Sequence, residues 1–136
     1  MSFDYILDTF GKSRKRKTRF TELEEKTVSL LTSFVDGTLD SKDFALAFDG
    51  IRKKYIELTE NDGQTVIDED TPLWLNTLLG LHYIKWLQFQ QLKWYFEEHP
   101  DELVGEKKAR FNDIQQMGYE KRFVETCRSV LRELTK

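Results

Sequence analysis

The stretch DSKDFALAFDGIRKKYIEL, residues 40–58, decides the fold class of this chain. Its apolar side chains recur at steps of one, three or four residues, which is the spacing of one helix face, and they are Phe44, Ala47, Phe48, Ile51, Tyr55 and Leu58. Charged side chains such as Asp49 and Arg52 fall on the opposite face. Asp40 and Ser41 are residue types that accept hydrogen bonds from the first turn of a helix. The stretch therefore predicts an amphipathic helix that packs against the rest of the chain.

The sequence on either side predicts three further main helices. The first spans about residues 21–36 and begins with Thr21 and Glu24, which have the spacing of a capping box. Another spans about residues 72–98, begins with a Thr-Pro step, and carries apolar residues nearly all round, as in a helix buried on several sides. The last covers about residues 100–134.

Glycines mark the points where these helices are expected to end or bend. Gly37 stands where a left-handed C-terminal cap belongs, and Gly80 is either a close-packing point or a local weakness. Gly118 bends or breaks the last helix, because Gly costs about 1 kcal/mol relative to Ala in a helix interior. The longest interior loop covers residues 59–71 and contains turn residues at 61–63. No strand is predicted, because the extended stretch in this loop is too short for a sheet.

These elements predict an all-α fold with one domain, residues 20–136, built as an antiparallel helical bundle of about four main helices with short connections. Residues 1–19 precede it as a short helix and a basic arm. Phe3, Ile6, Leu7 and Phe10 have helical spacing, whereas the run GKSRKRKTR has no apolar side chain to bury. The bundle is therefore expected to carry the core, and the arm to lie outside it.

Composition excludes several classes of protein. The chain has 136 residues, of which 39% are hydrophobic and 13% aromatic, so disorder of the whole chain is not expected. One Cys excludes an intrachain disulfide and a cysteine-built zinc site, and two His disfavour a His-rich metal site. No Gly-rich phosphate loop or nucleophile elbow occurs. Cys127 and His82 lie in apolar helical stretches and are expected in the core, so the sequence predicts neither an enzyme nor a cofactor.

The sequence predicts a cytoplasmic protein. The first ten residues lack the basic start and apolar run of a signal peptide. Residues 73–96 are long enough to span a bilayer, but they contain His82, Lys85 and Lys93, and charges at the centre of a membrane are costly. We therefore expect this stretch to be a core helix.

Charge is unevenly placed along the chain. Residues 1–20 carry six basic and two acidic side chains, whereas residues 57–70 carry six acidic side chains and no Lys or Arg. An acidic segment of this kind complements a basic surface on a partner, and a neighbouring Trp is a frequent interface anchor. The predicted partner-binding residues are Glu57, Glu60, Asp62, Asp68, Glu69, Asp70 and Trp74. The alternatives are that the acidic segment is a solvated loop and that Trp74 belongs to the core.

The basic arm suggests a second class of function. The cations from Lys12 to Arg19 match a small nucleic-acid-associated or regulatory protein, because they can neutralise phosphates without reading sequence. The overall acidity, with a net charge of −3, opposes this interpretation. A third possibility is a helical subunit of a larger assembly that uses exposed aromatic residues.

One stretch carries a resemblance to a known family. The sequence LLTSFVDGTLDSKDFALAFDGIRKKY, Leu30–Tyr55, joins a helix ending in an aromatic-aliphatic pair to a Gly-containing turn and a new helix with an acidic cap. It resembles the opening of small helical immunity proteins that protect bacteria from colicin D-type and contact-dependent growth-inhibition toxins. The resemblance implies a non-enzymatic inhibitor that blocks a cationic nuclease toxin with acidic side chains standing in for RNA phosphates. The basic arm, Lys12 to Arg19, departs from that pattern.

Overall fold

The computed structural model describes residues 16–136 and is predominantly helical. Six α-helices and one 3-10 turn are present in this part of the chain: α1 (Thr21–Val35), α2 (Ser41–Thr59), α3 (Trp74–Leu78), α4 (Leu81–Glu98), η1 (Pro100–Glu102), α5 (Gly105–Gln116) and α6 (Tyr119–Leu134). The helical class predicted from the sequence is confirmed. The predicted short helix from Phe3 to Phe10 lies outside the described residues, as does the first part of the basic arm.

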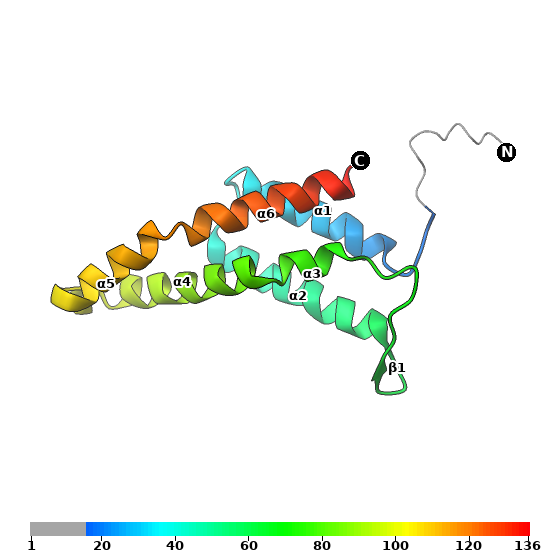
Figure 1. Ribbon diagram of the computed structural model, residues 1–136, viewed down its shortest axis with the longest axis horizontal. Coiled ribbons are helices and arrows are strands. Elements are labelled where there is room, and N and C mark those ends of the chain that lie inside the picture. Colours follow the sequence, from blue (N-terminus) through cyan, green and yellow to red (C-terminus); the bar gives the residue numbers. More distant parts are fainter. Residues whose placement is uncertain (1–15) are drawn as a thin grey trace.

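The last long helix, α6, lies among three other helices. It packs against α1 on one side and against α3 and α4 on the other, and α1 also packs against α2. Figure 1 shows α1 and α6 running above α2, α3 and α4, with α5 and the end of α4 extending beyond the rest of the helices. The core is therefore formed where α1, α2, α4 and α6 meet.

Aromatic side chains fill this core. Phe34 of α1 stacks on Phe44 of α2 with a distance of 4.1 Å between ring centroids, and Phe44 meets Trp86 of α4 edge-on at 5.6 Å. Trp86 in turn lies 4.9 Å from Phe123 of α6. Phe44 and Phe123 are fully buried. One cluster of rings therefore joins four helices, and Phe44 and Phe48 of the predicted stripe lie in it, whereas Ala47 of that stripe is exposed.

The predicted helix starts are partly confirmed. Asp40 caps α2 as expected, because its side chain accepts a hydrogen bond of 2.8 Å from the backbone N–H of Asp43. The predicted capping box at the start of α1 is wrong. The hydroxyl of Thr21 accepts instead from the backbone of Thr18, and Glu24 accepts a hydrogen bond from Trp74. A tertiary contact has replaced a local one.

The predicted continuous helix over residues 72–98 is in fact two helices, α3 and α4. The chain breaks at Gly80, whose backbone lies so close to the preceding turn that an added Cβ would stand 3.3 Å from the Thr77 carbonyl oxygen. The predicted start is also displaced, because α3 begins at Trp74. The long helix predicted over residues 100–134 is likewise divided, and its break at Gly118, with φ of 77°, is confirmed.

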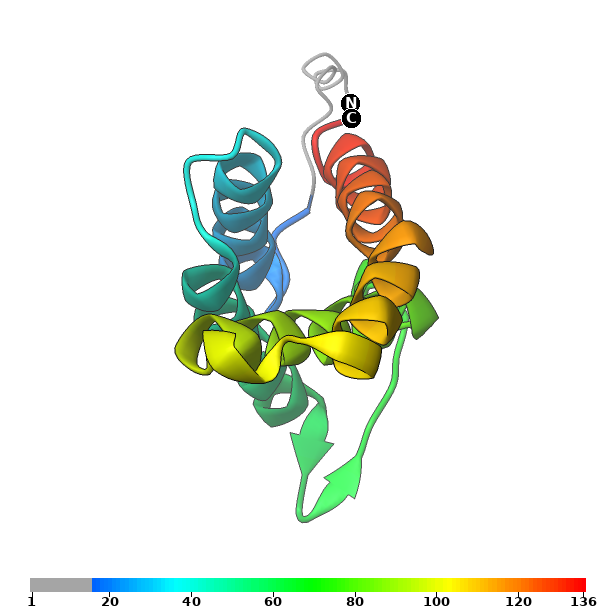
Figure 2. The same cartoon turned by 90° about the vertical axis from the view of Figure 1, so that its left-hand side faces the viewer.

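A short hairpin follows α2, so the prediction of no strands is wrong. Strands β1 (Glu60–Asn61) and β2 (Gln64–Thr65) pair antiparallel, with Glu60 opposite Thr65 and Asn61 opposite Gln64. Asp62 and Gly63 form the two-residue turn with φ of 54° and 77°, the left-handed conformations that this kind of turn needs. Figure 2 shows the hairpin projecting away from the helices.

Helix α4 is less enclosed than its sequence suggests. Only Trp86, Phe89 and Gln90 are buried in it, and Leu81 is 65% exposed. The expectation of a core histidine is wrong, because His82 is exposed and its Nδ1 lies 2.8 Å from the hydroxyl of Thr126. Within residues 16–136, no helix has both the length and the apolar character needed to cross a membrane.

A candidate protein-binding site on the projecting hairpin

The segment from residue 56 to residue 70, called here the acidic hairpin, contains all six predicted acidic site residues. Glu57, Glu60, Asp62, Asp68 and Glu69 are exposed, and Asp70 is half-buried. The segment starts on the last turn of α2, passes through β1 and β2, and returns toward α3 (Figure 2). The structure thus brings the acidic residues to one projecting part of the molecule.

Two of these carboxylates are already paired with the basic arm. Arg16 forms an ion pair with Asp70, and the Nη1 atom of Arg19 lies 3.1 Å from Oδ2 of Asp68. Arg19 also donates a hydrogen bond of 2.9 Å from Nε to the carbonyl oxygen of Leu58, at the end of α2. The two charged features of the sequence therefore meet, and these arginines are engaged within the chain.

Asp68 also organises the loop after the hairpin. Its carboxylate accepts hydrogen bonds from the backbone N–H of Asp70 and from the hydroxyl of Thr71, at 3.0 and 3.2 Å. Desolvation by itself raises the pKa of Asp68, but the hydrogen bonds from Arg19, Asp70 and Thr71 outweigh it and hold the pKa below its ordinary value. Asp68 is therefore a structural residue of this loop.

The remaining carboxylates differ in their availability. Glu57 pairs with Lys54 of the same helix, at 2.9 Å between Oε1 and Nζ. Glu60, Asp62 and Glu69 make no ion pair with any residue of the described chain and are exposed to solvent. These three carboxylates are therefore the ones in the acidic hairpin that a cation from outside the described chain can approach without displacing an existing ion pair.

The acidic hairpin also exposes apolar side chains, which were not among the site residues predicted from the sequence. Ile67 is 62% exposed, and Ile56 and Val66 are exposed as well. An apolar centre with a charged rim is the usual composition of a protein-binding surface. The sequence contained a signal for this exposed apolar surface, because Val66 and Ile67 are apolar residues in a polar loop and belong to no helical stripe.

Trp74, the predicted interface anchor, lies in the core. It is only 7% exposed, and its Nε1 donates a hydrogen bond of 3.1 Å to Glu24 of α1. It therefore presents little surface to a partner, and its main role is to join α3 to α1.

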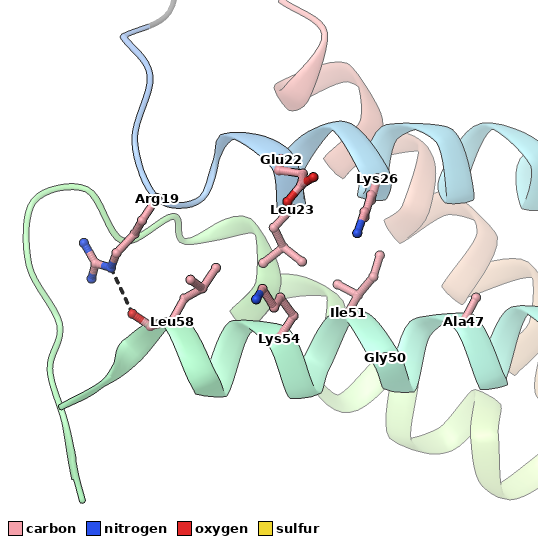
Figure 3. A pocket seen from close by; sticks show the side chains of 9 residues that line it. All are labelled: Arg19, Glu22, Leu23, Lys26, Ala47, Gly50, Ile51, Lys54 and Leu58. Carbon is pink, nitrogen blue, oxygen red and sulfur yellow. Dashed lines mark hydrogen bonds between the residues drawn. The ribbon is translucent and has the colours of Figure 1, made fainter. Parts of the chain in front are cut away.

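The pocket between α1 and α2 has a volume of about 440 Å³ and is drawn in Figure 3. Leu23 and Ile51 form its apolar part, and its charged side chains are Arg19, Glu22, Lys26 and Lys54. Its lining holds a single carboxylate and no His, Cys, Ser or Thr, so it lacks the hydroxyl or thiol nucleophile with a neighbouring base that covalent catalysis uses. The acidic hairpin is therefore a stronger candidate for the functional site than this pocket between α1 and α2.

Other reactive groups in the described chain are enclosed or scattered. Cys127 is fully buried, and this burial raises the pKa of its thiol to about 12, so it is a core residue as the sequence predicted. Among residues 16–136 no group of three His, Cys, Asp or Glu side chains is close enough to hold a metal ion.

Comparison with known proteins finds no matching family, no matching curated protein and no matching solved structure.

Proposed function

We propose that this protein is a cytoplasmic immunity protein: a non-enzymatic antiparallel bundle that binds and neutralises a cationic, nuclease-type bacterial toxin. The acidic hairpin binds the basic active site of the toxin, and its carboxylates occupy the positions of nucleic-acid phosphates. The interaction is protein–protein and needs no cofactor.

One observation carries the proposal. The acidic hairpin projects from the helices and exposes three carboxylates without ion pairs in the described chain, those of Glu60, Asp62 and Glu69, beside exposed Ile67. Exposed carboxylates raise the rate of association with a cationic surface, and apolar contacts slow dissociation. Both properties serve an inhibitor.

The ion pairs of the basic arm also support the acidic hairpin as the surface that binds the partner. A cationic toxin would be repelled by free arginines beside the hairpin. Arg16 and Arg19 are instead paired with Asp70 and Asp68, so they neutralise two carboxylates and leave the hairpin tip acidic. The same pairing disfavours a nucleic-acid interface built on these two arginines.

The test uses the full chain and the proteins encoded beside it in its native host. Each is purified and titrated calorimetrically against the wild-type chain and against the triple variant Glu60→Lys, Asp62→Asn and Glu69→Lys, in which Asn suits the left-handed turn position of Asp62. We expect one basic partner whose affinity falls by at least about 100-fold in the triple variant, as for loss of close charged contacts.

The matched control is the triple variant Glu25→Lys, Asp113→Asn and Glu125→Lys. These residues are exposed and form no ion pair within the described chain, so the control changes the net charge by the same amount elsewhere. We expect it to retain affinity within about fivefold, since distant surface charge acts mainly through screened attraction. Equal losses in both variants, or tight salt-resistant binding to a nucleic acid in place of a protein, would overturn the proposal.

A further inference from the structure

A second surface, unlike the acidic hairpin, lies along the junction of α4 with α5 and α6. Three adjoining hollows share lining residues and form one groove. The first two hollows share Leu81 and His82, and the second and third share Lys85 and Tyr119. Leu81 and Leu92, its end residues on α4, are 11 positions apart, so the groove is about 17 Å long, or about three helical turns.

The charged side chains that line the groove are cationic. Lys85 stands on α4 and Arg122 on α6, and both line the middle hollow together with His82. Neither Lys85 nor Arg122 forms an ion pair with another residue of the described chain. No Asp or Glu lines any of the three hollows, although the chain has 24 acidic residues. The lining of the groove is therefore opposite in charge to the chain as a whole, whose net charge is −3.

Each end of the groove presents an exposed apolar side chain, although the Leu81 end is otherwise lined by polar residues, Thr77, His82, Thr126 and Ser129. Leu81, which is 65% exposed, lies at one end, and Met117, also exposed, lies at the other. Phe89 and Ile114 form part of the lining near Met117. A ligand that fits therefore has apolar groups at both ends and negative charge at its centre, which a small anion does not provide.

We propose that this groove binds an acidic amphipathic helix of a partner protein. Helices pack along the junction of two others by placing side chains into the groove between them, and a three-turn helix matches its length. Apolar residues two to three turns apart contact the Leu81 and Met117 ends, and Asp or Glu side chains between them pair with Lys85 and Arg122. This surface is separate from the acidic hairpin and does not depend on the function proposed for it.

The probe is a labelled 14-residue helical peptide with Leu on one face and Glu at the centre, titrated by fluorescence anisotropy against the full chain. A second peptide has Lys in place of each Glu. The test variant is Lys85→Glu with Arg122→Glu, and the control is Lys121→Glu with Arg128→Glu. The control residues are exposed cations of α6 that do not line the groove.

We expect the wild-type chain and the control variant to bind the acidic peptide alike, within about twofold, and the test variant to bind it at least about tenfold more weakly. The test variant should gain affinity for the Lys peptide, which also shows that it is folded. Failure of the wild-type chain to bind the acidic peptide, or equal losses in both variants, would overturn the proposal. Self-association of the chain that Lys85→Glu with Arg122→Glu abolishes would also overturn it, because a second copy would then be the occupant.

Discussion

Gly50→Ala is expected to stabilise the protein. Gly50 lies within α2, and a Cβ added there meets no atom within 4 Å, because it faces the open pocket between α1 and α2. Ala in a helix interior is favoured over Gly by about 1 kcal/mol. The free energy of unfolding should therefore rise by about 1 kcal/mol, and Tm by about 3–5 °C for a domain of this size.

The matched control adds the same methyl group at Gly118. A Cβ there also meets nothing within 4 Å, but Gly118 has φ of 77°, in the left-handed region. Ala in that conformation costs about 1–2 kcal/mol, so Gly118→Ala should lower stability by about that amount. Urea unfolding followed by circular dichroism measures both variants. Shifts of the same sign in the two variants would refute the reasoning, because only backbone conformation distinguishes the sites. Gly50→Ala should also leave binding of the proposed partner unchanged, since Gly50 itself lies outside the acidic hairpin.

Three further predictions concern the core and its polar contacts. Phe48→Ala should cost about 3–5 kcal/mol in urea unfolding, because the ring is fully buried and lies 4.9 Å from the ring of Tyr83; a loss below about 1 kcal/mol would contradict this packing. Burial raises the pKa of Glu120, but hydrogen bonds from Gln90 and Lys93 outweigh it and leave the pKa below its ordinary 4.5. Glu120→Gln should therefore lower the free energy of unfolding by a constant amount, about 1 kcal/mol, above pH 4.5, and by progressively less as the pH falls through the lowered pKa. A stability difference between wild type and variant that persists at low pH would refute the ion pair. Cys127, with its pKa near 12, should react with iodoacetamide at pH 8 only as fast as the protein opens, and denaturant should accelerate the reaction greatly.

Local signals were sufficient for the features that depend on neighbouring residues. The stripe from Phe44 to Leu58 identified α2 because Phe44, Phe48 and Ile51 have helical spacing and are all buried, although Ala47 of the same stripe is exposed. The Asp40 cap and the break at Gly118 were predictable for the same reason, since each depends on one residue and its own backbone. The turn residues at Asp62 and Gly63 were identified, but the strands beside them are too short for a periodic signal.

Features set by distant residues were not predictable from local patterns. Glu24 bonds to Trp74, 50 residues away, in place of completing a capping box. Arg16 and Asp70 are 54 residues apart, so the arm and the acidic segment looked like separate features. Apolar residues all round α4 suggested burial, but the rest of the chain is too small to cover every face, and Leu81 and His82 remain exposed.

These contacts determine how the acidic hairpin must be tested. Reversing the adjacent carboxylates Asp68, Glu69 and Asp70 together would place lysines against Arg16 and Arg19 and remove the acceptor that holds the loop. A loss of partner affinity in that variant would not separate a lost contact from a displaced loop. Glu60 and Glu69 have no such role within the described chain, and Asn at position 62 suits the left-handed turn conformation that Asp62 holds, with φ of 54°. Replacing these three carboxylates therefore changes the charge that a partner meets and keeps the contacts of the loop, so an effect on affinity reports on the proposed interface.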